Sequence, residues 1–380
     1  MKILHTSDWH IGRQFHHVSL LEDQRHALHQ LMDLIEREAI DVLLVAGDIY
    51  DRSVPPAAAV ALLDEVLQKI CLDLNVPVIM IPGNHDSAER LGFGSAQLKQ
   101  AGLHILADLS AVSEPVVISK GAETCHFYGI PYHDPEHVRD VFEADVSNYQ
   151  QALEWLMQQI ELDDGVANIV LSHSFVAGGE ASESERPLSI GGADQVSADL
   201  FARFDYAALG HLHAPQTRSA PYIRYSGSLL KYSFSEQDHD KGVTLLEVSN
   251  HQVSAIHHHP LKPLRNLRTL EGALADVLAQ GATDPQADDY VMVRLSDTHA
   301  ILDAMGKLRE AYPNVLHLEK TGLMTAASSH HLEREKIKRN ELAMFDDFFQ
   351  QMTGQGLSED QHSAVQQTID SLHKNREPTA

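Results

Sequence analysis

Short apolar runs alternate with amphipathic stretches along the first two thirds of the chain. The segment Val42–Val45 is entirely apolar, which is typical of a strand buried on both faces. Leucine and isoleucine recur at helical spacing between Leu20 and Ala39, and a second helix is expected from Pro55 to about Leu74. Strands that alternate with helices favour an α/β fold. The strands expected in this part are Ile3–Thr6, Asp41–Ala46, Val76–Ile81, Leu103–Leu106, Pro115–Ser119, Cys125–Gly129, Ala167–Leu171, Tyr206–Leu209, Ile223–Ser226, Gly242–Val248 and Val253–His257.

A second, smaller module follows two prolines, Pro260 and Pro263, that indicate a linker. Its pattern predicts a small α/β module built from the segments Arg265–Leu270, Glu271–Gln280, Tyr290–Leu295, Ala300–Tyr312 and Val315–Lys320. We therefore expect three parts: residues 1–260, 264–325 and 328–380.

The last part has a helical pattern with one break. Ile337, Met344, Phe345, Phe348, Phe349 and Met352 fall at helix spacing before Gly354 and Gly356 interrupt it. Ser358 with Gln361 predicts a capping box for a final helix. The aromatic stripe either packs against its own domain or binds a partner, and the pattern leaves both interpretations open.

Composition limits the class of protein. A chain of 380 residues exceeds what one core usually serves, and 43% hydrophobic residues suffice for a folded protein. The 29 basic and 54 acidic residues give a net charge of −25, which argues against coating nucleic acid or anionic membrane by bulk charge. Cys71 and Cys125 are too few for a disulfide framework, and both are expected in the core. With no apolar run long enough for a signal or a membrane span, we expect a cytoplasmic protein.

Five short motifs carry the candidate chemistry. Each follows the carboxyl end of an expected strand, where layered α/β sheets usually assemble ligand sites. One four-letter motif arises by chance with a probability of about 0.002 in a chain this long, whereas five in order do not. The motifs are Asp8-Trp9-His10, Gly47-Asp48-Ile49-Tyr50-Asp51-Arg52, Gly83-Asn84-His85-Asp86, the single His173, and Gly210-His211-Leu212-His213.

The residue types suit divalent metal ions. Residues two apart in an extended or turning chain can point the same way, so Asp8 with His10, and His211 with His213, can aim paired ligands into one cleft. Carboxylate, imidazole and amide oxygen together suit Mn²⁺, Fe²⁺ or Zn²⁺. Two such ions sharing a carboxylate can stabilise both the attacking and the leaving oxygen of a phosphoryl transfer.

These motifs resemble the calcineurin-like metallophosphoesterase superfamily, whose signature is D-x-H, G-D-x-x-D, G-N-H-D or G-N-H-E, H and G-H-x-H. Within it, the stretch His5-Thr6-Ser7 before Asp8-Trp9-His10, the stretch Asp205–His213 and the motif Tyr225-Ser226-Gly227-Ser228 are similar to the DNA double-strand-break repair nucleases. The resemblance implies a β-sandwich flanked by helices (αββα), followed by a small α/β capping domain and a helical C-terminal tail. The resemblance is strong over about residues 1–260. For the later module and the tail it rests only on their order and position along the chain.

The resemblance also assigns roles to individual residues. Asp8, His10, Asp48 and His213 would hold one divalent ion, with Asp48 bridging to a second ion held by Asn84, His173 and His211. His85 would protonate the leaving oxygen, and Asp86 and Asp51 would orient neighbouring groups, although Asp51 can equally stabilise a turn. Two Mn²⁺ ions are the expected cofactors.

The implied activity is that of a 3′–5′ double-strand exonuclease and hairpin or single-strand endonuclease working in DNA repair with an SbcC-type coiled-coil ATPase. The tail would bind that ATPase, and the chain would form a homodimer within a heterotetramer, for which the apolar helix Ala57–Leu74 is one candidate surface. Two alternatives remain: a phosphoesterase for nucleotides or phosphoproteins, and a scaffold subunit without activity. No ligand position is missing, which argues against the scaffold.

The charge distribution suggests how DNA would be contacted. Acidic residues dominate 134–205, where Arg139, Arg186 and Arg203 are the basic side chains. Contact therefore has to be local, and the isolated chain should bind DNA weakly. The candidate phosphate contacts lie near the motif loops: Arg13, Arg52, Arg90 and Lys231. The other histidines, among them His257–His259, His16, His17, His26, His29, His330 and His331, are expected on the surface.

Overall fold

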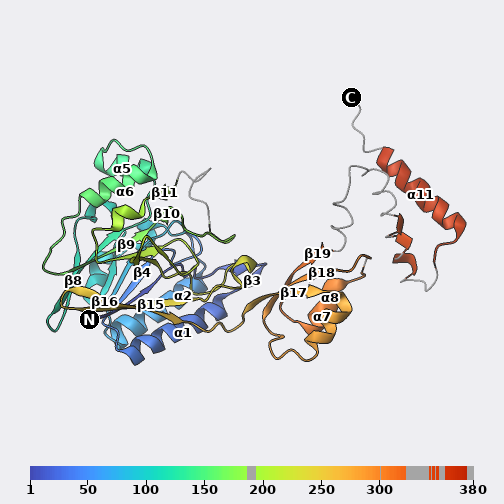
Figure 1. Ribbon diagram of the computed structural model, residues 1–380, viewed down its shortest axis with the longest axis horizontal. Helices are drawn as coiled ribbons and strands as arrows, with labels where there is room; N and C mark the ends of the chain where they lie inside the picture. Colours follow the sequence, from blue (N-terminus) through green and yellow to red (C-terminus); the bar gives the residue numbers. More distant parts are fainter. Residues whose placement is uncertain are drawn as a thin grey trace. The chain divides into compact units, whose positions relative to one another are not determined.

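The chain divides into two compact units, Met1–Leu264 and Arg265–Ala380. The computed structural model describes residues 1–185, 194–299, 301–321, 342–343, 345–346, 348–350 and 356–374 (Figure 1). Some residues singled out from the sequence lie outside these ranges, namely Arg186, His330, His331, Ile337, Met344, Met352 and Gly354.

The first unit contains two six-stranded sheets. In the first sheet the strand order is β16-β15-β1-β4-β5-β6. Strands β1, β4, β5 and β6 run parallel, and β15 pairs antiparallel with β1. Their bounds are β1 Lys2–Thr6, β4 Val42–Ala46, β5 Val78–Ile81, β6 Leu103–Ile105, β15 Gly242–Ser249 and β16 Gln252–Pro260.

The second sheet has the order β13-β14-β12-β9-β8-β7, with β8, β9, β12 and β14 parallel. Its strands are β7 Val116–Lys120, β8 Glu123–Ile130, β9 Ala167–His173, β12 Tyr206–Gly210, β13 Gln216–Arg218 and β14 Ala220–Tyr225. The short pairs β2 Gln14–Phe15 with β3 Val18–Ser19, and β10 Phe175–Val176 with β11 Gln195–Val196, lie outside the two sheets.

The two sheets pack face to face around a common apolar core. Val42 and Leu44 of β4 pack there with Ile169 and Leu171 of β9 and with Phe127 of β8. Because alternate side chains of a strand point to opposite faces, Leu43 and Val45, which are also buried, face the other side of the first sheet. Helices flank the sandwich (Figure 1), so the fold predicted from the motifs is confirmed.

Helix α1, Leu21–Glu38, matches the expected helix and ends at Ala39 in the left-handed conformation. Helix α2, Ala57–Leu67, continues as the π-helix Gln68–Asp73 instead of one regular helix to Leu74. Two helices were not expected: α5, Pro135–Phe142, and α6, Tyr149–Gln158, which pack against the outer face of the second sheet. Shorter helical turns are α3 Ala88–Leu91, α4 Ser95–Leu98, and the 3-10 turns Lys99–Ala101, Leu109–Ala111, Ala198–Phe201 and Phe234–Glu236.

The hairpin between β15 and β16 turns at Asn250 and His251, both at positive φ. Strand β16 was predicted to end at His257, but it continues to Pro260 because its backbone pairs with β15 as far as Gly242. Of the three consecutive histidines only His257 is exposed, whereas His258 and His259 are half-buried. The predicted surface run is therefore partly wrong.

The second unit contains a three-stranded parallel sheet, β17 Leu267–Gly272, β18 Tyr290–Leu295 and β19 Val315–Lys320. Helix α7, Leu274–Gly281, begins three residues after the start of the segment Glu271–Gln280, because Glu271 and Gly272 still pair with β18. Helix α8, Ala304–Ala311, begins after Asp303, whose carboxylate accepts the Gly306 N–H. Helix α11, Glu359–Lys374, starts with the predicted capping box of Ser358 and Gln361.

Both cysteines, Cys71 and Cys125, are buried with free thiols, as predicted. Among the described helices, none combines the length and the apolar character that crossing a membrane requires.

Candidate metal centre

The motif residues gather at one edge of the sandwich because their strands are parallel neighbours within each of two sheets that pack face to face. Strand β1 leads to Asp8, and β4 leads to Asp48. Strand β5 is followed by the loop of Asn84, while β9 ends at His173 and β12 leads to His211. Carboxyl ends of parallel strands meet at one edge, so five loops supply side chains to one place.

Four of the motif residues have a backbone conformation that side chains rarely adopt. The φ angles of Asp8, His10, Asp48 and His211 are 52°, 45°, 51° and 102°. Left-handed backbone at non-glycine residues costs on the order of 1–3 kcal/mol each and persists where the surrounding structure enforces it. Such strain concentrated in one place is typical of a functional site.

Two glycines allow His173 to approach the first sheet. A Cβ atom at Gly47 would lie 2.3 Å from His173 Nδ1, and one at Gly210 would lie 1.8 Å from the Ala46 carbonyl oxygen. Gly47 also has a φ of 95°. A side chain at either position would therefore displace the imidazole or the neighbouring backbone.

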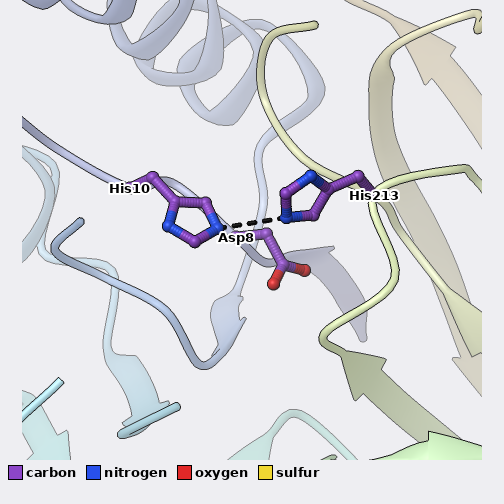
Figure 2. Close-up of side chains that lie close together, drawn as sticks. All are labelled: Asp8, His10 and His213. Carbon is purple, nitrogen blue, oxygen red and sulfur yellow. Dashed lines mark hydrogen bonds between the residues drawn. The ribbon is translucent and has the colours of Figure 1, made fainter. Parts of the chain in front are cut away.

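Asp8, His10 and His213 form a first cluster of candidate ligands (Figure 2). All three are buried, and the Nε2 atoms of His10 and His213 lie 3.1 Å apart. The Asp8 carboxylate accepts the backbone N–H of His211 at 3.0 Å.

Asp48 lies between this cluster and a second one. Its Oδ2 is 3.6 Å from His10 Nε2 and 3.5 Å from His173 Nε2. The Asn84 amide oxygen lies 3.0 Å from His173 Nε2 and 3.3 Å from His211 Nδ1. The structure thus brings together all seven residues selected from the sequence as candidate ligands.

Hydrogen bonds fix the orientation of His173. Its Nδ1 lies 2.9 Å from the Ala46 carbonyl oxygen, and because a carbonyl can only accept, Nδ1 carries a proton. Nε2 is therefore the ring nitrogen that faces Asp48 and Asn84. Fixing a ligand histidine by a hydrogen bond to its other nitrogen is usual in metal sites.

Burial and mutual charges perturb the ionisable groups. Burial raises the pKa of Asp8 to about 6, and the negative charge of Asp48 adds to this effect. Burial also opposes ionisation of Asp48, but the neighbouring His173 and His10 hold its pKa well below the ordinary value. Against burial, the charge of Asp48 raises the pKa of His173 to about 9, whereas burial lowers the pKa of His10.

The donor set fits divalent cations. Two nitrogen ligands about 2.1 Å from one ion and at right angles lie about 3.0 Å apart, which is close to the separation of the facing His10 and His213 nitrogens. Among the described residues, the Nδ1 of His10 and the amide nitrogen of Asn84 are buried and have no hydrogen-bond partner, which is uncommon for buried polar atoms. Mixed nitrogen and oxygen donors suit first-row transition ions.

His85 stands at the rim of this cluster. Its Nδ1 donates to the backbone carbonyl of Asp51 at 2.9 Å, so Nε2 is not engaged by this bond. The ring lies edge-on to that of His10, with centroids 4.7 Å apart. The Asp51 carboxylate is 3.8 Å from His10 Nδ1 and accepts a hydrogen bond from Arg13 at 3.2 Å.

Asp86 joins two of the motif loops. Its carboxylate accepts backbone N–H groups from Ile49, Tyr50 and Gly83 at 2.9–3.0 Å. The backbone N–H of His85 in turn donates to Asp48 at 2.9 Å. Asp86 therefore holds the loop of Asp48 against the loop of Asn84 and His85.

A buried ion pair next to His213 was missed by the sequence analysis. Glu236 and Lys241 are fully or nearly fully buried and 2.5 Å apart, and Lys241 also donates to the His213 carbonyl at 2.7 Å. Ser184 and Glu185 contact His213 as well. No motif spacing connects positions 184, 185, 236 and 241, so only the fold shows that they meet.

The four candidate DNA contacts differ in their surroundings. Arg13 is bound by Asp51, by the Ser184 carbonyl and by the ring of Tyr232, and Lys231 donates to the Gln237 carbonyl. Arg52 and Arg90 have exposed side chains near the motif loops, and Arg52 Nε also lies 3.7 Å from the Asp51 carboxylate. The side chains of Arg52 and Arg90 are therefore more exposed than those of Arg13 and Lys231.

Two family models match the chain. The model described as calcineurin-like phosphoesterase matches residues 1–215. The model described as type 5 capsule protein repressor C-terminal domain matches residues 263–353.

Curated relatives match nearly the whole length. The D subunit of nuclease SbcCD from Staphylococcus epidermidis is 36% identical over 97% of this chain and 98% of its own. The protein of the same name from Staphylococcus saprophyticus is 36% identical over 98% of both chains. Among solved structures, TT1561 of Thermus thermophilus is 13% identical, with a TM-score of 0.39 over 69% of this chain and 99% of its own.

Proposed function

Because the chain belongs to the calcineurin-like phosphoesterase family, and matches the D subunits of SbcCD nucleases over nearly its full length, we propose that it is a metal-dependent DNA nuclease. The observation that carries this proposal is the meeting of seven buried or half-buried donor side chains at one sheet edge. Together with the family membership, that donor set supports hydrolysis of phosphodiesters.

We assign the seven donors to two divalent ions, with Mn²⁺ as the proposed metal. Asp8, His10, Asp48 and His213 would hold one ion. Asp48 would also contact the second ion, together with Asn84, His173 and His211. The position of Asp48 Oδ2, nearly equidistant from His10 and His173, supports the bridging role.

His85 is the proposed general acid. When bound, the ions activate water for attack on phosphorus and neutralise charge on the phosphate oxygens. As the bond between phosphorus and the sugar oxygen breaks, His85 in its doubly protonated form would donate its Nε2 proton to that oxygen and keep its Nδ1 proton hydrogen-bonded to the Asp51 carbonyl. The hydrogen bond from Nδ1 to the Asp51 carbonyl orients the ring for this transfer. Asp51, held by Arg13, would orient His10 in turn.

Within this function we propose 3′–5′ exonuclease activity on duplex DNA and endonuclease activity on hairpins and single strands. The α/β module of the second unit would act as a capping domain that restricts the cleft to DNA. Arg52 and Arg90 would contact phosphates. The protein would act in the cytoplasm, where bacterial DNA is found.

The tail is proposed to bind an SbcC-type coiled-coil ATPase. Helix α11 has exposed positions on one part of its surface and half-buried positions such as Val365 and Ile369 on another. The side chains of Phe345 and Phe348 are 41% and 44% exposed. Exposed aromatic side chains are enriched at protein interfaces. Co-purification of the full chain, and of a chain ending at Leu323, tests this: the ATPase should accompany only the full chain. An ATPase that stays with the shortened chain would place the contact elsewhere.

A groove beside α2 is the proposed homodimer surface. Its volume is about 730 Å³, and among its lining residues Val54, Leu72 and Phe93 are 60%, 62% and 86% exposed. Large apolar side chains gathered on one face indicate an interface. A second copy of the chain would cover them.

The test of the main function compares substrates. The purified chain with Mn²⁺ should cleave a linear DNA duplex with far higher kcat/KM than any nucleotide or phosphopeptide in a panel. His213→Asn should lose turnover of every substrate. Preference for a nucleotide or a phosphopeptide in the wild-type chain would instead assign a small-molecule or protein phosphoesterase.

A further inference from the structure

Glu236 is the centre of a buried group of polar side chains next to the candidate ligand His213. This group lies at the Nδ1 side of the His213 ring, whereas His10 lies at the Nε2 side. Glu236 Oε1 accepts hydrogen bonds from the hydroxyls of Ser182 and Ser184. Its Oε2 pairs with Lys241. Neither Glu236 nor any of these three partners belongs to a motif of the family signature.

The direction of each hydrogen bond follows from the acceptor at its end. A carboxylate can only accept, so the Ser184 hydroxyl donates its single proton to Glu236. Ser184 Oγ then has only lone pairs for His213 Nδ1, which lies 2.5 Å away. His213 Nδ1 must therefore carry the proton, and Nε2, which faces His10, keeps its lone pair.

Lys241 fixes the same arrangement from the backbone side. Its ammonium group donates to the His213 carbonyl at 2.7 Å and to the Ser228 hydroxyl at 2.9 Å. Glu185 accepts the His213 backbone N–H at 2.8 Å. Both the main chain and the ring of His213 are thus held by one charged network that spans residues far apart in the sequence.

We infer that Ser184 and the Glu236–Lys241 pair are positioning residues that fix His213 in the tautomer required of a metal ligand. This inference rests on the proposed function, because it takes His213 as a ligand. A hydrogen-bonded partner behind a ligand imidazole raises its basicity and fixes its ring, and its removal typically costs about 10–100-fold in metal affinity or activity.

The test measures Mn²⁺ affinity by calorimetry without DNA. Ser184→Ala removes the hydroxyl that connects Glu236 to His213 Nδ1, so the Mn²⁺ affinity of the site that contains His213 should fall by about tenfold. Ser184→Thr keeps a hydroxyl at this position and should retain the wild-type affinity. Tyr128→Phe is the matched control, because it removes a hydroxyl that donates to the Glu161 carbonyl at 3.0 Å elsewhere in the same unit. It should leave Mn²⁺ affinity unchanged.

A second variant addresses the ion pair. Glu236→Gln alone leaves Lys241 buried without its charge partner and risks misfolding. The double variant Glu236→Gln with Lys241→Met removes both charges, and it should weaken the same site while near-native circular dichroism confirms folding.

His213→Asn separates failure of this inference from failure of the proposed function. If wild type and His213→Asn bind Mn²⁺ equally, His213 is no ligand and the metal assignment is wrong. If His213→Asn binds Mn²⁺ more weakly than wild type, a wild-type Mn²⁺ affinity in Ser184→Ala overturns the positioning role. The positioning role is also overturned if the double variant His213→Asn with Ser184→Ala binds Mn²⁺ more weakly than His213→Asn alone, because Ser184 would then act through a group other than His213.

Discussion

The Nε2 atoms of His10 and His213 face each other at 3.1 Å, and both side chains are buried. Burial holds the pKa of His10 well below its ordinary value, so that ring is neutral. The Ser184 hydroxyl places the proton of His213 on Nδ1, so His213 Nε2 offers a lone pair near Asp8 and Asp48, and the neutral ring of His10 has one unprotonated nitrogen of its own. A divalent cation is the group that such a set of donors binds best.

Metal binding should therefore stabilise the fold. At a free Mn²⁺ concentration of about 100 times Kd, the free energy of unfolding should rise by about 2.7 kcal/mol, which is roughly 5 °C in Tm for a unit of this size. Differential scanning fluorimetry with EDTA and then with Mn²⁺ measures this. His10→Gln should lose most of the increase, whereas His17→Gln, a change at an exposed histidine, should keep it. Equal increases in both variants would argue against the assigned ligands.

Replacing His85 should separate catalysis from metal binding. His85→Leu cannot protonate the leaving oxygen, so kcat on duplex DNA should fall by about 10²–10⁴-fold while the stoichiometry of Mn²⁺ remains that of the wild type. A nitrophenyl phosphodiester serves as control, because its leaving group departs as a stable anion. The loss on that substrate should be much smaller. Near-normal turnover of DNA in the variant would remove His85 from the mechanism.

The position of the candidate site could be predicted because its residues lie in short motifs that directly follow apolar strands. Each motif follows an apolar strand, and residues such as Asp8 and His10 lie two positions apart in one loop. The parallel order of β4 and β5 brings Asp48 and Asn84 together within the first sheet, whereas His173, at the end of β9 in the second sheet, joins them because the two sheets pack face to face. The motifs thus marked the region of the site, and the resemblance to the family assigned its seven ligands, but neither predicted the distances between them.

What could not be predicted depends on contacts between distant positions. Ser184, Glu236 and Lys241 have no spacing that relates them, and each alone is an ordinary polar residue in the sequence. The extension of β16 to Pro260 likewise depends on pairing with β15. The environment of Arg13 depends on Asp51 and Tyr232, which come from other loops.

Arg52 and Arg90 should contribute separately to DNA binding. Each contact with a phosphate adds about 0.9 to the slope of log affinity against log salt, so Arg52→Ala or Arg90→Ala should reduce that slope by about one. Fluorescence anisotropy with EDTA at several salt concentrations measures it. Arg37→Ala is the control, since Arg37 and Arg52 both have side chains that are 65% exposed. A slope unchanged in both loop variants would exclude these contacts.

The groove beside α2 makes a prediction about the oligomer. Phe93→Glu places a charge on a side chain that is 86% exposed in the single chain and would be buried in the proposed dimer. Light scattering after gel filtration should give twice the chain mass of 42.1 kDa for wild type and the single mass for this variant. Val117→Glu, at a 52% exposed apolar position outside the groove, should remain dimeric. A monomeric wild type, or dissociation in both variants, would contradict the assigned surface.

Stability should fall with acidification through His133. This side chain is buried, its Nδ1 donates to the Pro131 carbonyl at 2.9 Å, and burial lowers its pKa to about 4. Between about pH 6.5 and 4 the unfolded chain binds a proton that the folded chain does not. The free energy of unfolding therefore falls as the pH decreases, by up to about 1.4 kcal/mol per pH unit from this group.

His133→Gln should remove this contribution. Urea unfolding at several pH values between 4 and 7, in EDTA, should show a shallower loss of stability for the variant than for wild type. The control is His257→Gln, which changes an exposed histidine on β16 and should follow the wild-type curve. Parallel curves for wild type and His133→Gln would show that His133 takes up its proton at the same pH in the folded and unfolded chain. That result would require water or a charged group to reach His133 in solution, because a buried neutral imidazole cannot titrate normally.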